Sequence, residues 1–109
     1  MQRMGMVIGI RPERIAEYKE YHKAVWPGVL AKISECNIRN YSIFLREPEN
    51  LLFAYFEYHG DDFAADSAKM AADPTTQKWW EINMPCQRRL DTAKEGEWWS
   101  AMPSVFFYP

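Results

Sequence analysis

Apolar side chains recur every three or four residues after Pro12, a spacing that places them along one side of an α-helix. A proline suits the first turn of a helix, where its missing N–H is not needed. Pro27 interrupts the pattern, because a proline inside a helix removes a hydrogen bond and clashes with the preceding turn. The sequence therefore predicts a helix that breaks around Val25 and Trp26 and a second piece that ends near Glu35. The apolar stripe consists of Ile15, Tyr18, His22, Val25, Val29 and Ile33.

Three segments before residue 60 have the composition of β-strands. Residues 4–10 form a short apolar run with glycines that ends just before Pro12. Residues 38–46 and 51–58 are rich in β-branched and aromatic side chains, and the turn sequence EPEN joins them. These two segments predict a β-hairpin. Because side chains alternate along a strand, one face of its first strand carries Tyr41, Ile43 and Leu45.

Two shorter helices are predicted after the hairpin. Asp61 or Asp62 can cap a helix over residues 63–72, which ends before a proline. A further helix is expected to begin at Thr75 and to end before Pro85.

The remaining segment predicts a long irregular arm followed by a last strand. Residues 86–102 show no regular period, whereas residues 105–108, VFFY, have the composition of a strand. The resulting order, β-α-β-β-α-β, predicts an α+β class, ferredoxin-like sandwich with helices on one face of an antiparallel sheet. We expect residues 1–109 to form a single domain. Because the strands are apolar on both faces, the second face should meet another subunit, as in a homodimer, or enclose a ligand.

Composition excludes several classes of protein. The 109 residues carry a formal net charge of −2 and no run of basic residues, which argues against nucleic-acid binding. No apolar stretch is long enough to cross a membrane, and the first residues do not resemble a signal peptide, so we expect a cytoplasmic protein. Aromatic residues make up 16% of the chain, more than a small core easily buries, so some are expected in a pocket or interface. Cys36 and Cys86 lack metal-site spacing and are interpreted as buried thiols rather than as a disulfide or zinc site.

His22 is the first candidate for chemistry, because an imidazole can give or take a proton near neutral pH. It lies on the apolar stripe with Tyr18 one turn before it, so both should face the sheet. The structural alternative is a core-edge histidine whose nitrogens are satisfied by hydrogen bonds. Tyr41 could point at His22 or could simply belong to the core, and His59 is interpreted as a surface histidine.

Two tryptophan pairs are the other candidates. Trp79 and Trp80 point about 100° apart on a helix, so both are buried only where two surfaces meet. Such rings can stack on the C–H faces of a sugar or pack at a subunit interface. Trp98 and Trp99 repeat the pair in the arm, where a lid and a dimer contact are both plausible roles. The chain has no GxSxG, phosphate loop or HExxH motif, so we expect proton-transfer chemistry without a metal or cofactor.

Five motifs, in the same order and at similar spacing, resemble those of the L-rhamnose mutarotase family. They are EYKEYHKAVWP at residues 17–27, NYSIFL at 40–45, NLLFAYFE at 50–57, WW at 79–80 and the terminal VFFYP. The resemblance implies a small homodimer of ferredoxin-like fold that interconverts the α and β anomers of a free sugar without metal or cofactor. Relatives that act on L-fucose belong to the same group. The chain departs from the best-known members after Met84, which leaves the identity of the sugar open.

The resemblance implies that His22 is the catalytic proton donor. As imidazolium it would protonate the ring oxygen while an unassigned base takes the anomeric proton. The expected reaction is the mutarotation of a free 6-deoxy monosaccharide, L-rhamnose first and L-fucose as the alternative. Two other classes remain open, a cofactor-free monooxygenase on a similar dimeric sandwich and a sugar-binding module without activity. The sugar contacts implied by the family are Tyr18, Tyr41, Trp79 and Trp80.

Overall fold

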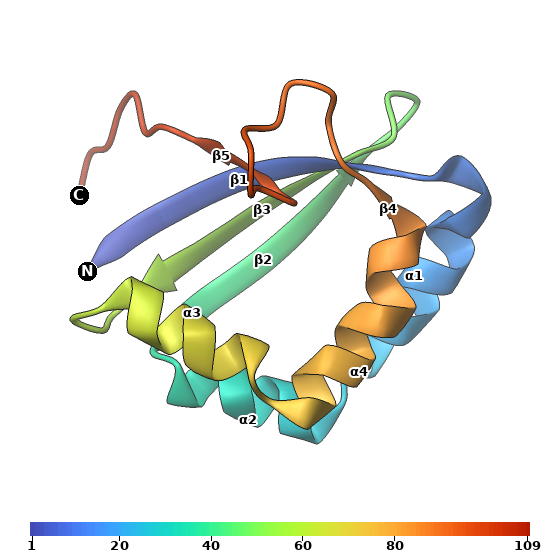
Figure 1. The fold of residues 1–109 in the computed structure, drawn as a ribbon. Coiled ribbons are helices and arrows are strands. Elements are labelled where there is room, and N and C mark those ends of the chain that lie inside the picture. Colours follow the sequence, from blue (N-terminus) through green and yellow to red (C-terminus); the bar gives the residue numbers. More distant parts are fainter.

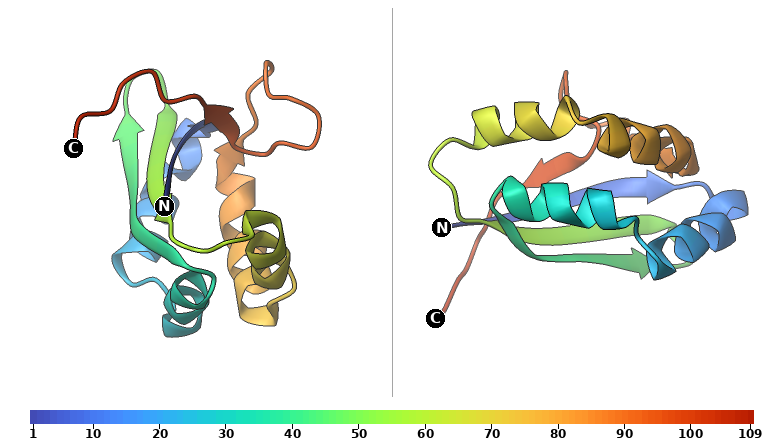
Figure 2. Two further views of the ribbon diagram at one scale, coloured as in Figure 1. Left: turned by 90° about the vertical axis from the view of Figure 1, so that its left-hand side faces the viewer. Right: turned by 90° about the horizontal axis from the view of Figure 1, so that it is seen from below.

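A computed structural model describes all of residues 1–109 as one sheet with helices packed against a single face (Figures 1 and 2). None of its helices is both long and apolar enough to span a membrane. The elements are β1 (Gln2–Ile10), a 3₁₀ turn (Pro12–Arg14), α1 (Ile15–Lys23), α2 (Pro27–Glu35), β2 (Ile38–Arg46), β3 (Leu51–Tyr58), α3 (Phe63–Ala71), α4 (Pro74–Asn83), a second 3₁₀ turn (Met84–Cys86), β4 (Gln87–Arg88) and β5 (Ser100–Met102).

The sheet is antiparallel throughout and has the strand order β2-β3-β1-β4, with β5 also paired to β1. The two hairpin strands have the predicted limits. This arrangement, with all four helices on the same side, confirms the α+β class and is consistent with the ferredoxin-like fold expected from the sequence.

The predicted last strand is wrong. Residues 105–108 are not in the sheet, and Val105 and Tyr108 are 94% and 82% exposed. The edge position beside β1 is occupied instead by β4 and β5, two short strands within the arm that was expected to be irregular. At Gly9 the strands approach closely, because a Cβ there would lie 2.9 Å from the carbonyl oxygen of Arg88.

The helix boundaries follow local sequence chemistry. The first helical segment breaks before Pro27, as predicted, and this proline occupies the first turn of α2. The Asp62 carboxylate caps α3 by accepting the Ala65 N–H at 3.1 Å. The Asp73 carboxylate caps α4 by accepting the Thr76 N–H at 2.9 Å and the Thr76 hydroxyl at 2.8 Å.

A β-bulge in β2 changes which residues face the helices. Arg39 pairs with Glu57 and Ser42 with Tyr55, so β2 has one more residue than β3 between these pairs. Within this bulge Asn40 adopts a positive φ of 52°. Strict alternation would put Ile38 and Tyr41 on opposite faces of the sheet. With the bulge, Ile38 packs into the core and Tyr41 lines a pocket on the same helical side.

The core between the sheet and the helices consists of two apolar clusters. The first cluster contains Ile8, Ile10, Ile15, Tyr18, Leu52 and Cys86, and the second contains Ile38, Phe56 and Tyr58. The two cysteines, Cys36 and Cys86, are buried and form no disulfide, as the sequence predicts.

Two leucine-to-alanine substitutions test this division between core and surface. Leu52→Ala removes a side chain that is 2% exposed and should lower the free energy of unfolding by about 3 kcal/mol. Leu30→Ala, at a residue that is 51% exposed, should change it by at most about 0.5 kcal/mol. Urea unfolding followed by circular dichroism measures both, and equal losses would contradict the assignment of the core.

Candidate functional site

His22 lies near the C-terminal end of α1, and one of its ring nitrogens is engaged in a hydrogen bond within the helix. Its Nδ1 lies 2.8 Å from the backbone carbonyl oxygen of Tyr18, and because a carbonyl only accepts, Nδ1 must carry the hydrogen. The imidazole stacks on the Tyr18 ring with centroids 4.1 Å apart. Burial lowers the pKa of His22 below its ordinary value of 6.5, an effect that the bond to Tyr18 opposes. The neutral form with a free Nε2 is therefore favoured at about pH 7.

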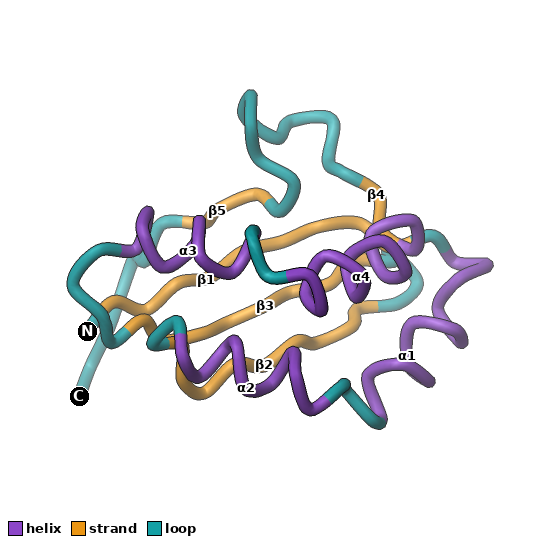
Figure 3. The backbone as a smooth tube through the Cα atoms, turned by 60° about the horizontal axis from the view of Figure 1, so that its bottom comes forward, coloured by secondary structure: helices purple, strands orange, loops and turns teal.

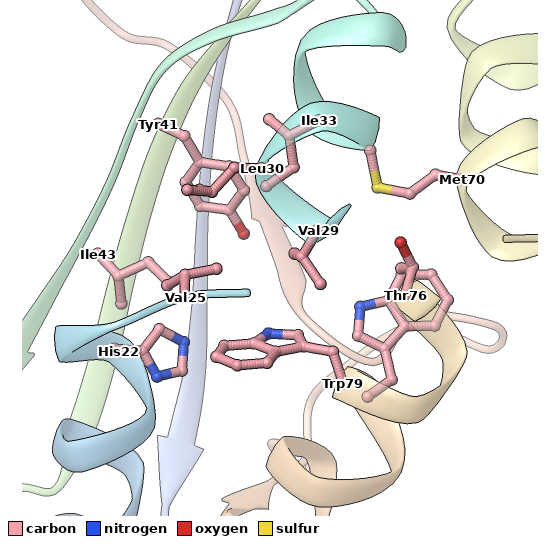
Figure 4. A pocket seen from close by; sticks show the side chains of 11 residues that line it. His22, Val25, Val29, Leu30, Ile33, Tyr41, Ile43, Met70, Thr76 and Trp79 are labelled. Atoms are coloured by element: carbon pink, nitrogen blue, oxygen red, sulfur yellow. The ribbon is translucent and has the colours of Figure 1, made fainter. Parts of the chain in front are cut away.

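A cavity of about 340 Å³ adjoins His22, between the helices and β2 (Figure 4). This volume lies at the lower end of the range for small-molecule sites. Four of the residues implied by the family resemblance, His22, Tyr41, Trp79 and Trp80, line it together. The other lining residues are mainly apolar: Val25, Val29, Leu30, Ile33, Ile43, Met70 and Thr76.

Tyr41 supplies a polar group to this mostly apolar cavity. Figure 4 shows its hydroxyl directed into the space between α2 and Trp79. Its ring packs against Phe56 with the ring centroids 5.3 Å apart, although the residue as a whole is 39% exposed. Burial raises the pKa of Tyr41, so the phenol stays protonated at neutral pH and can donate a hydrogen bond.

The adjacent tryptophans have different surroundings, as expected for neighbours on a helix. Trp79 is buried, and its ring makes edge-to-face contacts with three other rings. The distances between ring centroids are 5.2 Å to His22, 5.1 Å to Trp26 and 6.0 Å to Tyr21. Trp80 is half-buried and borders both the cavity and an open groove on the other side of α4. Trp79 therefore forms an inner wall of the cavity and Trp80 its rim.

Tyr18 does not line this cavity, unlike the other four predicted site residues. It lines a neighbouring cavity of about 350 Å³, and His22 and Ile43 border both cavities. The Tyr18 hydroxyl accepts a hydrogen bond from Nε2 of Gln87 at 3.3 Å. Burial raises the pKa of Tyr18, and the bond from Gln87 opposes this shift only in part. His22 thus stands between two cavities, each of which is lined by one tyrosine.

Several residues of the site carry no signal that distinguishes them in the sequence. Val29 and Ile33 lie on the same apolar stripe as His22, so their side of the helix was predictable. Met70 and Thr76 come from α3 and α4, and only the tertiary structure brings them to the cavity. Gln87 follows no motif, because its role depends on a contact with a residue 69 positions earlier in the chain.

The fold and the site define a small α+β protein with a half-enclosed aromatic pocket and a single histidine in its wall, whose Nδ1 is hydrogen-bonded to the Tyr18 carbonyl. No group of three or more His, Cys, Asp or Glu side chains is arranged to hold a metal ion. A model of the family described as L-rhamnose mutarotase matches residues 3–108. The chain belongs to the L-rhamnose mutarotase family.

Individual relatives agree with this assignment. The L-rhamnose mutarotase of Oceanobacillus iheyensis is 33% identical over 88 residues, which cover 81% of this chain and 82% of that protein. The L-rhamnose mutarotase of Mannheimia succiniciproducens is 38% identical over 80 residues, 73% of this chain and 74% of the relative. The crystal structure of L-rhamnose mutarotase FA22100 from Formosa agariphila has a TM-score of 0.79 over 100% of both chains. At 22% identity, this last likeness shows the fold.

Proposed function

We propose that the chain is an isomerase that interconverts the α and β anomers of a free 6-deoxy sugar, with L-rhamnose as its substrate. Membership of the family and the names of its relatives support the reaction and the sugar. The apolar residues Val29, Ile33 and Met70 around the cavity suit a sugar that carries a methyl group in place of a hydroxymethyl group. The cytoplasmic location expected from the sequence stays a prediction.

The observation that carries the proposal is the hydrogen bond from His22 to the Tyr18 carbonyl. It fixes the ring and leaves Nε2 as the nitrogen that exchanges a proton. Because burial favours the neutral imidazole, His22 begins the reaction as a base rather than as the imidazolium expected from the family resemblance.

Mutarotation requires a proton to leave one oxygen and reach another on the same carbon. In the proposed mechanism Nε2 takes the proton of the anomeric hydroxyl, the bond between C1 and the ring oxygen breaks, and C1 becomes an aldehyde. The imidazolium then delivers a proton to the ring oxygen, which is within reach because both oxygens start on C1. Rotation about C1–C2 and the reverse transfers close the other anomer, and His22 returns to its neutral form.

The other site residues hold the sugar in this scheme. The sugar lies against His22, which borders both cavities, so Tyr41 donates a hydrogen bond to it from one side and Tyr18 from the other. Trp79 and Trp80 exclude water and contact apolar C–H groups. The steps are proton transfers, cleavage and re-formation of the bond between C1 and the ring oxygen, and a bond rotation, with no change of oxidation state, so this mechanism does not call for a cofactor.

Substitution of the two histidines tests the assignment of His22. His22→Ala should slow anomer exchange of L-rhamnose by about 10²- to 10⁴-fold, because the proton carrier is lost. His59→Ala is the matched control, since that side chain is 43% exposed and bonds Glu57 outside the cavity. Saturation-transfer NMR between the two anomeric signals measures both rates. A wild-type rate of anomer exchange in the His22→Ala protein would rule out a catalytic role for His22.

Exchange rates of other sugars and a measurement of oxygen uptake separate the alternative functions. Faster exchange of L-fucose than of L-rhamnose would make L-fucose the substrate. Equal acceleration of all sugars would indicate a pocket without sugar specificity. Binding of L-rhamnose without acceleration would indicate a sugar-binding module. Consumption of oxygen at an electrode would favour the monooxygenase.

The pH dependence distinguishes the two starting states of His22. If neutral His22 is the base, kcat/KM falls as the pH drops through a pKa below 6.5 and stays level above about pH 7. If the imidazolium starts the reaction, kcat/KM instead declines as the pH rises through that pKa. Rates measured by NMR across this range decide between them.

We also propose that the chain forms a homodimer through the sheet face opposite the helices. Phe44 on this face is 65% exposed, and Phe53 beside it is only half-buried. The exposed segment 105–108 leaves β5 and extends away from the body of the molecule (Figure 2). Within the chain, Phe107 packs under Arg3, with 3.3 Å between Cζ and the ring centroid. An apolar face and an apolar tail that remain in water favour association with a second copy.

A charge on the open face tests the dimer. Phe44→Glu should shift the protein toward a monomer, because the carboxylate would have to be buried against the partner. Leu30→Glu introduces the same charge at an exposed residue on the helical side and should leave the mass unchanged. Sedimentation equilibrium measures the mass, and a monomeric wild-type protein would contradict the proposal.

A further inference from the structure

Trp98 lies at the end of the loop between β4 and β5 and begins a chain of hydrogen bonds that leads to the site. Its indole N–H donates to Oε1 of Gln87 at 2.7 Å, and Nε2 of Gln87 donates to the Tyr18 hydroxyl at 3.3 Å. Gln87 and Tyr18 are both buried. The chain of bonds therefore connects the loop with the residue that stacks on His22.

The chemistry of Trp98 sets the direction of this chain. An indole N–H can only donate, so it holds the carbonyl end of the Gln87 amide toward itself. The amino end of that amide then faces Tyr18, whose oxygen accepts. The hydrogen of the Tyr18 hydroxyl is thereby left for another acceptor. Because burial raises the pKa of Tyr18, the phenol retains that hydrogen at neutral pH.

We propose that Gln87 and Trp98 are positioning residues that hold the Tyr18 hydroxyl as a hydrogen-bond donor toward the sugar. This inference rests on the proposed function. A ring oxygen has no hydrogen and can only accept, whereas a sugar hydroxyl can do either. A fixed donor beside His22 therefore allows the ring oxygen to face the catalytic groups, an orientation that a fixed acceptor would exclude.

The loop is built to keep Trp98 in place. It leaves the sheet edge after β4 and returns at β5 (Figure 3). The Arg89 guanidinium donates to the carbonyl oxygens of Ala93, Lys94 and Glu97 at 3.1, 2.7 and 2.6 Å. Because Glu97 precedes Trp98 directly, these bonds fix the return of the loop. Trp98 also packs against the first core cluster.

The two neighbouring tryptophans provide a matched test. Trp98→Phe keeps an aromatic ring but removes the N–H, so the Gln87 amide can turn over and Tyr18 can donate to it. We expect kcat to fall about tenfold while KM changes little. Trp99 packs against the same cluster without a side-chain hydrogen bond, and Trp99→Phe should leave both constants within about twofold. Equal losses of kcat in the two variants would overturn the positioning role.

Two substitutions of Gln87 separate hydrogen-bond direction from packing. Gln87→Glu introduces a carboxylate that accepts from both neighbours and turns the Tyr18 hydrogen away from the sugar, so kcat should fall about a hundredfold. Gln87→Met removes both bonds without reversing either, and a loss of about tenfold is expected. At acidic pH the introduced carboxyl can take up a proton and donate, so the Gln87→Glu rate should approach that of wild type. Equal loss in the two variants at every pH would overturn the inference.

Failure of the proposed function would be recognised in the wild-type protein. If wild-type protein neither accelerates anomer exchange nor binds L-rhamnose in calorimetry, the proposed function fails and the positioning role fails with it. If wild-type protein converts L-rhamnose and Trp98→Phe converts it with the same kcat, only the positioning role fails.

Discussion

The carbonyl and the ring of Tyr18 both hold His22, and its hydroxyl bonds Gln87. The carbonyl accepts from Nδ1 of His22, the ring stacks on the imidazole, and the hydroxyl accepts from Gln87. Tyr18 is itself held by the main core cluster, which packs β1 and β3 against α1. Both the tautomer and the orientation of His22 thus depend on a residue that the hydrophobic core keeps in place. A rigid support of this kind is what proton transfer requires, since small errors in placement are costly for the rate.

Burial by aromatic rings gives the same site its electrostatic character. Trp79 covers one edge of His22 and also meets Trp26, which lies directly before the proline that starts α2. The break at Pro27 therefore matters for the site, because it places Trp26 at the corner between α1 and α2. Low local polarity lowers the pKa of His22 and raises the pKa of Tyr41. One physical cause keeps the imidazole neutral and the phenol protonated, which are the states that the proposed mechanism uses.

Local patterns predicted most of the fold, and the failures lie where distant residues decide. Turn chemistry and alternation gave the limits of β2 and β3, and Pro27 gave the helix break. The strand predicted at residues 105–108 was wrong, because its composition says nothing of whether an edge is already occupied by β4 and β5. The helical stripe brought Tyr18 and His22 together, and the structure places Tyr41, Trp79 and Trp80 around one cavity with His22. Gln87 was not predictable, since a buried amide acquires a direction only from its partners.

The arm after Met84, which contains the edge strands β4 and β5, contributes to the site in a different way from the rest of the chain. The motifs before residue 81 supply Tyr18, His22, Tyr41, Trp79 and Trp80, whereas the arm after Met84 reaches the site through the bond from Gln87 to Tyr18. If Gln87 and Trp98 position Tyr18 as proposed, a change in that arm alters the direction of one hydroxyl, whereas the bond between His22 and the Tyr18 carbonyl lies within α1. In the proposed enzyme, variation in the arm therefore acts on how the sugar is oriented, while the proton transfer depends on His22 and the helix that carries it.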